Sequence, residues 1–401
     1  MTDLKNADIL KSSLDELKNF PNISYILGEH KNEDIDWADL IIKNPAVKPG
    51  NEYIEYAHKT GKQVEQDMGI FLQFVKPSQI VGITGTKGKS TTASLIYEVL
   101  KNTNKDIIFA GNIGKSVLDA IEFINNKTVV ILEISSFQLE AFHDKKVSPK
   151  YALITNITPD HLNYYQTMDQ YINAKKVIGR YQTKDDLLFI RKDDPVINQD
   201  FIKEFKGKII YFSKDDLPKN FNPALAGKHN LENMAAALAV SKTFNVPQNN
   251  ALKTLASFSG VPFRLELIKV WRGVKIINDT TATGPDAGIQ ALKTFPGCIL
   301  ICGGMNKNMP YGEYAKAVIK YAKKVFFLTG DSTTEIKKLM ENKDLIAGTY
   351  NDLEKLLLDV KEVIQDGDTI LFSPAATSFN LFQNEFDRGR QFNQAVERVF
   401  G

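Results

Sequence analysis

A lysine and a serine follow two closely spaced glycines in the stretch 82–92, which reads Gly-Ile-Thr-Gly-Thr-Lys-Gly-Lys-Ser-Thr-Thr. Glycine-rich turns of this kind point backbone N–H groups at a phosphate. The Lys89 ammonium can neutralise the terminal phosphates of a nucleotide, and the Ser90 hydroxyl can hold Mg²⁺. The stretch therefore predicts a nucleotide-phosphate site, whose residues are Gly85, Thr86, Lys87, Gly88, Lys89, Ser90 and Thr91.

The stretch departs from the usual phosphate-loop spacing, which has a glycine five residues before Gly88, where Ile83 stands here. An ordinary glycine-rich turn with a solvated lysine is the alternative interpretation. The flanking residues favour the phosphate site, because 79–82 has the character of a strand leading into the turn and 93–100 that of a helix leading out.

Most of the chain alternates between short apolar runs and amphipathic stretches, which predicts an α/β fold with a mostly parallel sheet covered by helices on both faces. Ligands of such folds bind at the carboxyl ends of the strands. The expected strands lie at 37–42, 106–110, 128–134, 151–155, 275–278, 298–302, 325–329 and 369–373. The expected helices lie at 90–101, 168–182, 230–243, 284–293, 311–323, 351–364 and 388–399.

Polar residues follow several of these strands. Glu133 stands near the end of an apolar strand and is a natural Mg²⁺ ligand, although it could instead cap the next helix. His161 follows the next strand, where a histidine can bind a metal or a phosphate but is also often structural. Lys175 and Lys176 fall on the helix that begins near Met168, where a solvated helix face is the simpler interpretation.

The length and composition of the whole chain limit the class of protein that it can be. Its 401 residues are long for one core, so we expect two or three domains, with boundaries near Pro77 and Pro262. The net charge of +2 gives no support to nucleic-acid binding. The sequence has no apolar run of membrane-spanning length and no signal-peptide core, so we expect no membrane insertion. Cys298 and Cys302 are expected to be unpaired core residues of a cytoplasmic protein.

Seven ordered motifs resemble those of one family, the ATP-dependent Mur ligases of peptidoglycan synthesis, from about residue 3 to the C-terminus. The string at 135–139 is similar to that of the family members that add D-glutamate to UDP-N-acetylmuramoyl-L-alanine. The motifs are Gly-Thr-Lys-Gly-Lys-Ser-Thr-Thr at 85–92, Gly-Asn-Ile-Gly at 111–114, Glu-Ile-Ser-Ser-Phe-Gln-Leu-Glu at 133–140, Thr-Asn-Ile-Thr-Pro-Asp-His at 155–161, Gly-Lys-His-Asn at 227–230, Asn-Asp-Thr-Thr-Ala-Thr at 278–283 and Ser-Pro-Ala-Ala-Thr-Ser at 373–378.

The resemblance implies a three-domain α/β architecture. It predicts a UDP-substrate-binding domain at 1–77, which is Rossmann-like but truncated, a central ATP-binding domain with a P-loop-type parallel sheet at 78–262, and a Rossmann-like amino-acid-binding domain at 263–401. It also implies a cytoplasmic, monomeric ligase that uses ATP and Mg²⁺ and forms an acyl phosphate before D-glutamate attacks. Through peptidoglycan, such a ligase serves cell-wall synthesis, cell shape and cell division.

The resemblance also assigns roles to residues. Lys89 would contact the ATP phosphates, while Ser90, Glu133 and His161 would hold two Mg²⁺ ions. Lys175 matches the family's carbamylated lysine, a modification that turns a cation into a carboxylate-like ligand. Asn230 and Asn233 would approach the adenine of ATP, and Arg264 and Asp279 would contact ATP from the third domain. The implied contacts with the sugar nucleotide or D-glutamate are Asp3, Asn44, Asn112, Thr283, Lys307, Ser378 and Phe386.

The chain departs from the family pattern at several positions. Lys87 stands where relatives often carry asparagine, Thr281 stands where some carry lysine, and Phe386 is displaced by one residue from the expected aromatic position. Roughly 30 residues, including the glycine-rich turn that cradles the UDP pyrophosphate, have no counterpart at the start, so we expect a mis-assigned start codon or weak binding of the UDP substrate.

Two other functions remain open from the sequence. A folylpolyglutamate-synthetase-like amide ligase would share the phosphate loop, but the strings at 135–139 and 373–378 count against it. A non-catalytic ATP-binding paralogue with an eroded substrate domain would fit the short start. The joint presence of Lys89, Glu133, His161 and Lys175 counts against that second alternative.

Overall fold

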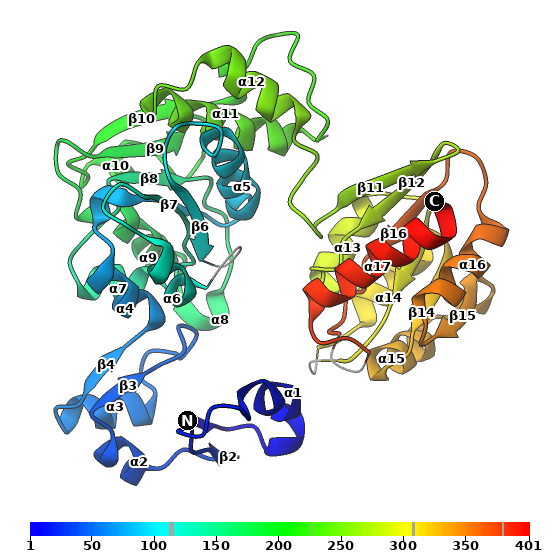
Figure 1. Ribbon diagram of the computed structural model, residues 1–401, viewed down its shortest axis with the longest axis horizontal. Helices are drawn as coiled ribbons and strands as arrows, with labels where there is room; N and C mark the ends of the chain where they lie inside the picture. The colour runs from blue at the N-terminus through cyan, green and yellow to red at the C-terminus, as the bar shows by residue number, and fades with distance from the viewer. Residues whose placement is uncertain (112–115, 226, 307–308, 379–380) are drawn as a thin grey trace. The chain divides into compact units, whose positions relative to one another are not determined.

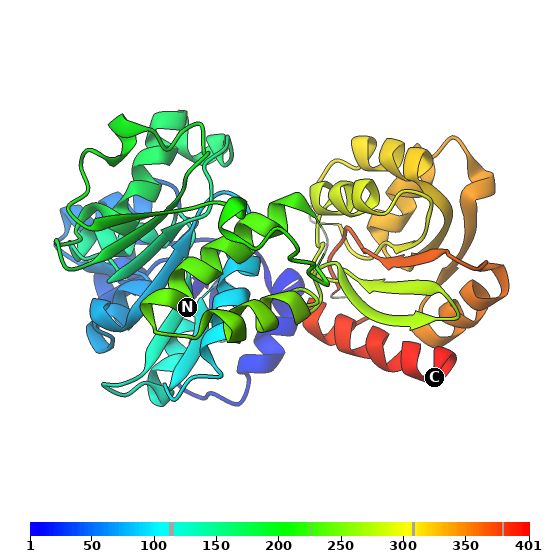
Figure 2. The same ribbon diagram turned by 90° about the horizontal axis from the view of Figure 1, so that it is seen from above.

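The computed structural model describes residues 1–111, 116–225, 227–306, 309–378 and 381–401. The chain divides into two compact units, the first formed by residues 1–6 and 23–258 and the second by residues 7–22 and 259–401. Each unit contains a six-stranded sheet with helices on its two faces (Figures 1 and 2). The α/β fold class predicted from the sequence is thereby confirmed, and the division into three domains stays a prediction.

The sheet of the first unit is parallel throughout, in the order β10-β9-β8-β5-β7-β6. Its central strands are buried on both faces, which explains their continuous apolar sequences. Because β5 lies in the middle of the sheet, the turn that follows it opens between its neighbours β7 and β8. The strands are β5 (Ile80–Thr84), β6 (Ile107–Gly111), β7 (Val129–Glu133), β8 (Tyr151–Ile154), β9 (Leu187–Arg191) and β10 (Lys208–Phe212).

Two groups of helices cover this sheet. The first group packs together on one face and consists of α5 (Lys89–Leu100), α11 (Lys228–Thr243) and α12 (Gln248–Ser257). The second group shares a core with the opposite face and consists of α4 (Asp67–Phe74), α6 (Val117–Ala120), α7 (Leu139–Asp144) and α9 (Met168–Arg180). Short helices occupy the connections: η1 (Pro77–Gln79), η2 (Ile121–Phe123), α8 (Leu162–Tyr165), α10 (Gln199–Ile202) and η3 (Lys214–Asp216).

The first 65 residues form two small parallel strand pairs, β1 with β2 and β3 with β4. The strand predicted at 37–42 was too long, since Trp37 ends a helix and the strand is confined to Leu40–Ile42. Acidic residues in the first turn favour that helix, which is not apolar enough for the sequence pattern to reveal. The elements are β1 (Thr2–Asp3), α1 (Ala7–Leu17), β2 (Ile26–Leu27), α2 (Asn32–Trp37), β3 (Leu40–Ile42), α3 (Glu52–Lys59) and β4 (Gln63–Glu65).

The sheet of the second unit has the order β11-β12-β16-β13-β14-β15, in which only β11 is antiparallel to its neighbour. One face packs on α13, α14 and α15, and the other packs on α16 and α17. The strands are β11 (Glu266–Trp271), β12 (Val274–Asn278), β13 (Cys298–Cys302), β14 (Ala322–Leu328), β15 (Ile346–Tyr350) and β16 (Thr369–Phe372). The helices are α13 (Pro285–Thr294), α14 (Gly312–Tyr321), α15 (Asp331–Leu339), η4 (Lys343–Leu345), α16 (Leu353–Val363) and α17 (Glu385–Phe400).

Most of the other predicted elements are confirmed to within two or three residues. The strand predicted at 325–329 begins earlier, at Ala322, because α14 ends at Tyr321 and the chain enters the sheet at once. Cys298 and Cys302 are buried and unpaired, as expected from their spacing. None of the described helices is long and apolar enough to cross a membrane.

Candidate active site

The turn after β5 requires glycine at two positions. Gly85 has a φ of +143° and Gly88 a φ of +82°, values that favour glycine over residues with a Cβ atom. A Cβ on Gly85 would overlap the Thr155 hydroxyl, and one on Gly88 would lie 2.5 Å from Asn233 Oδ1. Because α5 begins at Lys89, directly after Gly88, the free N–H groups of its first turn face the same space as the loop.

Residues that follow β8 hold this phosphate loop from the side. The Thr86 N–H donates to Asn156 O at 2.9 Å, and the Lys87 N–H donates to Asn156 Oδ1 at 3.0 Å. The Asn156 amide and the Thr155 hydroxyl both donate to Lys87 O, at 2.8 and 2.7 Å. The residue pattern alone assigned Asn156 no role, although a polar residue shortly after a buried strand is a signal for such a contact.

Two lysines meet at one carbonyl of the loop. Lys89 Nζ donates to Gly85 O at 3.1 Å and to Thr86 O at 3.0 Å, while Lys175 Nζ donates to Gly85 O at 2.8 Å. Lys175 is only 2% exposed, and its Nζ lies 4.7 Å from the centre of the Tyr171 ring. Burial, reinforced by the Lys89 charge, holds the pKa of Lys175 well below its ordinary value.

The solvated-face interpretation is therefore wrong for Lys175, and the side chain of its neighbour Lys176 is only partly exposed. Lys176 has a different partner, since its Nζ pairs with the Glu204 carboxylate at 2.9 Å and its side chain is 15% exposed. The two residues lie on the same helix, and their successive positions are about 100° apart around its axis. This geometry separates a buried amine beside the phosphate loop from a partly shielded ion pair with Glu204.

Two oxygen donors lie beside the loop. Glu133 ends β7, is 3% exposed, and pairs with Ile83 in the register of β5. Ser90 is the second residue of α5 and is 5% exposed. Carboxylate and hydroxyl oxygens next to a phosphate site fit Mg²⁺, which usually takes one or two protein ligands and completes its shell with phosphates and water. Within the described ranges, no three His, Cys, Asp or Glu side chains gather as a metal cluster.

His161 lies in the segment after β8, where its backbone has a φ of +53°. Its ring packs against Phe137 with centroids 5.0 Å apart and is about half exposed, at 45%. Partial burial lowers the pKa of His161, and the charges of Lys175 and Lys89 act in the same direction against the opposing Asp160. A neutral imidazole can bind a metal or accept a hydrogen bond from a ligand.

A cavity of about 580 Å³ opens in front of the phosphate loop. Lys89 and His161 line it, and so does Asn44 from the N-terminal part of the unit. Glu133, Lys175 and Asp3 are not among its described lining residues, and the Asp3 carboxylate accepts the Lys5 N–H at 2.8 Å. Its other lining residues are Pro45, Ala46, Asp67, Gly111, Ser116, Val117, Ser135, Phe137 and Gln138.

The two predicted adenine contacts lie at the start of α11. Asn233 Oδ1 accepts the Thr92 hydroxyl at 3.2 Å, and Asn233 Nδ2 donates to Asn230 Oδ1 at 3.2 Å. Both asparagines are buried, and Asn233 stands directly against Gly88 of the phosphate loop. The structure thus brings them to the nucleotide-phosphate site, while their contact with adenine stays a prediction.

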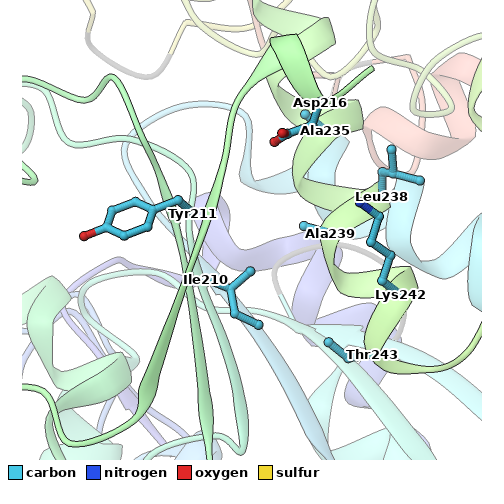
Figure 3. A pocket seen from close by; sticks show the side chains of 8 residues that line it. All are labelled: Ile210, Tyr211, Asp216, Ala235, Leu238, Ala239, Lys242 and Thr243. Atoms are coloured by element: carbon cyan, nitrogen blue, oxygen red, sulfur yellow. The ribbon is translucent and has the colours of Figure 1, made fainter. Parts of the chain in front are cut away.

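A second pocket lies away from this site, between β10 and α11 (Figure 3). None of the residues predicted to act on ATP, metal or substrate lines it. Its side chains are mostly apolar, with Asp216 and Lys242 at its borders. The pocket is therefore separate from the candidate active site.

The second unit contains the remaining predicted contacts. Asp279 follows β12, where its carboxylate accepts the Ser373 hydroxyl at 2.7 Å and the Leu265 N–H at 3.1 Å. Burial raises the pKa of Asp279 to about 7, although both hydrogen bonds and the charge of Arg264 oppose the rise. The Thr281 hydroxyl, at the position where some relatives carry lysine, donates to Phe263 O at 2.8 Å and anchors the loop instead.

Arg388 fixes the two loops that carry the predicted amino-acid contacts. This fully buried side chain donates to Thr280 Oγ1 and O at 2.9 and 2.7 Å and to Ala376 O at 3.0 Å. Thr283 and Ser378 lie within three residues of these anchor points, and Ser378 is 2% exposed. Phe386 is 42% exposed near Phe263, with ring centroids 6.3 Å apart. Two further predicted contacts, Asn112 and Lys307, lie outside the described residues.

The raised pKa of Asp279 predicts a pH-dependent stability. Between its ordinary pKa of 3.8 and its pKa of about 7 in the folded protein, the folded state holds a proton that the unfolded state has lost. The free energy of unfolding therefore falls as the pH rises through this window. Asp279→Asn removes this titration. The unfolding free energy of the variant minus that of the wild type should therefore be about 2–3 kcal/mol larger at pH 8 than at pH 5.

Urea unfolding followed by Trp271 fluorescence would measure this difference, because Trp271 lies in the second unit and the only other tryptophan, Trp37, lies in the first. Asn keeps the acceptor for Leu265 and can donate to Ser373, so the hydrogen bonds themselves should survive the change. A gain of the same size at both pH values would refute the assignment of this titration to Asp279.

Comparison with known proteins connects this site to one family. The sequence pattern of the Mur ligase middle domain matches residues 83–224, which contain the phosphate loop, Glu133, His161 and Lys175. The structure is similar to UDP-N-acetylmuramate-alanine ligase MurC from Thermotoga maritima, with a TM-score of 0.56, 20% identity, and coverage of 99% of this chain and 93% of that one. It is also similar to the MurF ligase of Thermotoga maritima solved with ADP, with a TM-score of 0.56, 18% identity, and coverage of 90% and 94%.

Curated relatives are more similar in sequence. A UDP-N-acetylmuramoylalanine--D-glutamate ligase from Roseiflexus is 35% identical over 99% of this chain and 92% of the relative. Proteins of the same name from Borreliella afzelii and Clostridioides difficile are 36% and 32% identical, over 100% of this chain and 92% and 93% of the relatives. Fold and phosphate site together thus define a Mur ligase. Within that class the chain belongs to the UDP-N-acetylmuramoylalanine--D-glutamate ligases, which confirms the resemblance seen in the sequence.

Proposed function

We propose that this protein is an ATP-dependent ligase that joins D-glutamate to UDP-N-acetylmuramoyl-L-alanine in cytoplasmic peptidoglycan precursor synthesis. The observation that carries the proposal is the meeting of Lys89 and Lys175 at Gly85 O, on a sheet edge that also presents Glu133. The family membership of nearly the whole chain supports the choice of substrates. We expect the protein to act as a monomer with the three domains given above.

In the first step, the carboxylate of the muramoyl-alanine substrate attacks the γ-phosphorus of ATP. A carboxylate-oxygen-to-phosphorus bond forms, the bond to the β-phosphate oxygen breaks, and ADP leaves. The phosphate oxygens carry the developing negative charge, which the Lys89 ammonium and the loop N–H groups are positioned to stabilise. Asn230 and Asn233 from this unit, and Arg264 and Asp279 from the second, would complete ATP binding.

In the second step, the amine of D-glutamate attacks the carbonyl carbon of the acyl phosphate. The amide bond forms, the amine loses a proton, and inorganic phosphate leaves with an oxygen that began in the substrate carboxylate. D-glutamate carries two carboxylates, which suit a cation and hydroxyl donors. We assign these roles to Lys307, Thr283 and Ser378, with Phe386 beside them, and the sugar nucleotide to Asp3, Asn44 and Asn112.

Ser90, Glu133, His161 and a carbamylated Lys175 would hold Mg²⁺. The metal would supply electrostatic stabilisation of phosphate charge, as Mg²⁺ does in other phosphoryl-transfer sites. The Lys175 amine itself cannot be a good ligand while it is a cation. Its lowered pKa supports carbamylation, in which the neutral nitrogen attacks CO₂, forms an N–C bond and releases a proton.

A substrate matrix tests the proposal. Phosphate release should require ATP, UDP-N-acetylmuramoyl-L-alanine and D-glutamate together, and omission of any one should reduce it to background. Release with a folate and L-glutamate would favour the folylpolyglutamate-synthetase-like alternative. ATP binding by calorimetry without release in any mixture would favour the non-catalytic paralogue, and either result would overturn the proposed function.

A further inference from the structure

The chain segment 43–47, from Lys43 to Val47, reaches the active-site cavity and is held at its first end by a carboxylate. Asn44, Pro45 and Ala46 of this segment line the cavity together with Lys89 and His161. Just before them, Lys43 Nζ donates to Glu140 Oε2 at 2.7 Å. Gln66 Nε2 donates to the same oxygen at 2.7 Å, so Glu140 binds two parts of the N-terminal region at once.

A tyrosine holds the other end of the segment. The Tyr164 hydroxyl donates to Val47 O at 3.1 Å. Tyr164 comes three residues after His161, and its ring packs on Phe137 with centroids 4.5 Å apart. Glu140 stands three residues after Phe137 on α7. Both anchors of segment 43–47 thus belong to the two chain segments that form the cavity wall around His161 and Phe137.

Between the anchors, the segment closes on itself. The Asn44 side chain accepts the Ala46 N–H at 2.9 Å, and Asn44 O accepts the Val47 N–H at 3.0 Å. The segment therefore behaves as one compact turn whose position depends on its two ends. The Lys43 end is partly shielded from solvent, because the Lys43 side chain is 13% exposed and the Glu140 side chain 37% exposed. Charged hydrogen bonds of this partly buried kind are stronger than exposed ion pairs.

Glu140 and Tyr164 do not themselves line the cavity among the described residues. They line a separate pocket, which shares Phe137 with the cavity and does not include Lys89 among its lining residues. Their contacts with Lys43 and Val47 thus reach the substrate cavity only through segment 43–47. Separations of 97 and 117 residues along the chain make these contacts specific to the folded unit.

We propose that Glu140 and Tyr164 are positioning residues that clamp segment 43–47 against the active site and so set the affinity for the nucleotide-sugar substrate. The proposal rests on the proposed function, because that function places this substrate in the cavity. Loosening either anchor leaves the phosphate loop intact and frees the turn that faces the substrate. The clamp therefore acts on substrate binding and leaves ATP binding unchanged.

Steady-state kinetics of two conservative variants test the clamp. Glu140→Gln should raise the KM for UDP-N-acetylmuramoyl-L-alanine about tenfold, and Tyr164→Phe about fivefold, as expected for a charged and a neutral hydrogen bond. For both variants, kcat and the KM for ATP should stay within about twofold of the wild type, since neither anchor touches the phosphate loop. A general structural role would instead lower kcat and raise both KM values together.

Matched controls use contacts of the same kind elsewhere in the unit. Glu204, 36% exposed, accepts Lys176 at 2.9 Å, and the Tyr181 hydroxyl lies 2.6 Å from His143 Nδ1. Glu204→Gln and Tyr181→Phe should leave the KM for the nucleotide substrate unchanged. Lys43→Met should raise the KM for the nucleotide substrate as Glu140→Gln does. The KM of the double variant should not exceed that of the more affected single variant, because both changes remove the same Lys43–Glu140 contact.

Hydrogen exchange separates failure of the clamp from failure of the proposed function. Amides of residues 44, 46 and 47 should exchange faster in Glu140→Gln and in Tyr164→Phe than in the wild type, while those of 82–92 should not change. This readout needs no turnover, so it holds even if the wild-type protein ligates nothing. Unchanged exchange at 44–47, or a nucleotide-substrate KM within twofold of wild type in an active enzyme, would overturn the clamp.

Discussion

Replacing Lys175 by methionine is expected to lower kcat for D-glutamate ligation about a thousandfold or more. The amine is buried against Gly85 O beside Lys89, and carbamylation would convert it into the anionic partner of that cation and of Mg²⁺. Methionine has a similar length, cannot be carbamylated and brings no charge. The fold should survive, because a buried amine with a lowered pKa gains little from its charge.

Lys176→Met is the matched control, since it removes the adjacent lysine, which pairs with Glu204 and not with the phosphate loop. It should change kcat less than twofold. With ¹³C-labelled bicarbonate, the wild type and Lys176→Met should each show a carbamate resonance that Lys175→Met lacks. Full activity of Lys175→Met, with a melting temperature equal to that of the wild type, would contradict the role given to this residue.

Lys89→Met is expected to lower kcat by about two to three orders of magnitude, the usual effect of removing one donor at a developing oxyanion. Its ammonium bridges Gly85 O and Thr86 O, so it lies at the mouth of the phosphate loop and lines the cavity. Lys87 carries the same charge two residues away, but its hydrogen bonds with the Asn156 side chain involve only the backbone N–H and O of Lys87. Lys87→Met should therefore cost less than about threefold.

Rapid-quench measurement of ADP formation compares the two variants on the phosphoryl-transfer step. Slow ADP formation in Lys89→Met, together with near-normal ADP formation in Lys87→Met, would show that the position of the charge decides the rate. Equal losses in the two variants would mean that the loop responds only to total positive charge. That result would remove the specific role of Lys89.

The phosphate loop and its strand were predictable because their chemistry is local in sequence. Glycines with positive φ, a lysine and a serine stand within six residues, directly between an apolar run and a helix. The buried strands were equally accessible, since parallel strands covered on both faces are continuous apolar runs. The fold class and most strand positions followed from these two signals.

The environment of Lys175 could not be derived from the same kind of pattern. Lys175 and Lys176 are adjacent lysines on an amphipathic helix, and only packing decides which of them is buried beside Gly85. The family resemblance singled out Lys175, which is buried in the structure, whereas the residue pattern alone favoured a solvated face. Charge in a sequence shows that a residue can ionise, but burial decides the state it adopts.

Contacts between distant loops were missed for a related reason. Asn156 and Phe137 act through loop backbone and ring packing, which leave no periodic signal. The link from Glu140 to Lys43 joins residues 97 positions apart. In the second unit, nothing in the local pattern of α17 singles out Arg388, yet it is buried and ties Thr280 to Ala376.

The measurement that most directly tests the account follows one oxygen atom. UDP-N-acetylmuramoyl-L-alanine labelled with ¹⁸O in its alanine carboxylate should be turned over with ATP, Mg²⁺ and D-glutamate. If the carboxylate attacks the γ-phosphorus and the amine then displaces phosphate, one ¹⁸O atom appears in each inorganic phosphate, with one ADP and one amide product formed. Unlabelled phosphate, or ADP formed without amide product, would contradict the proposed ligase mechanism.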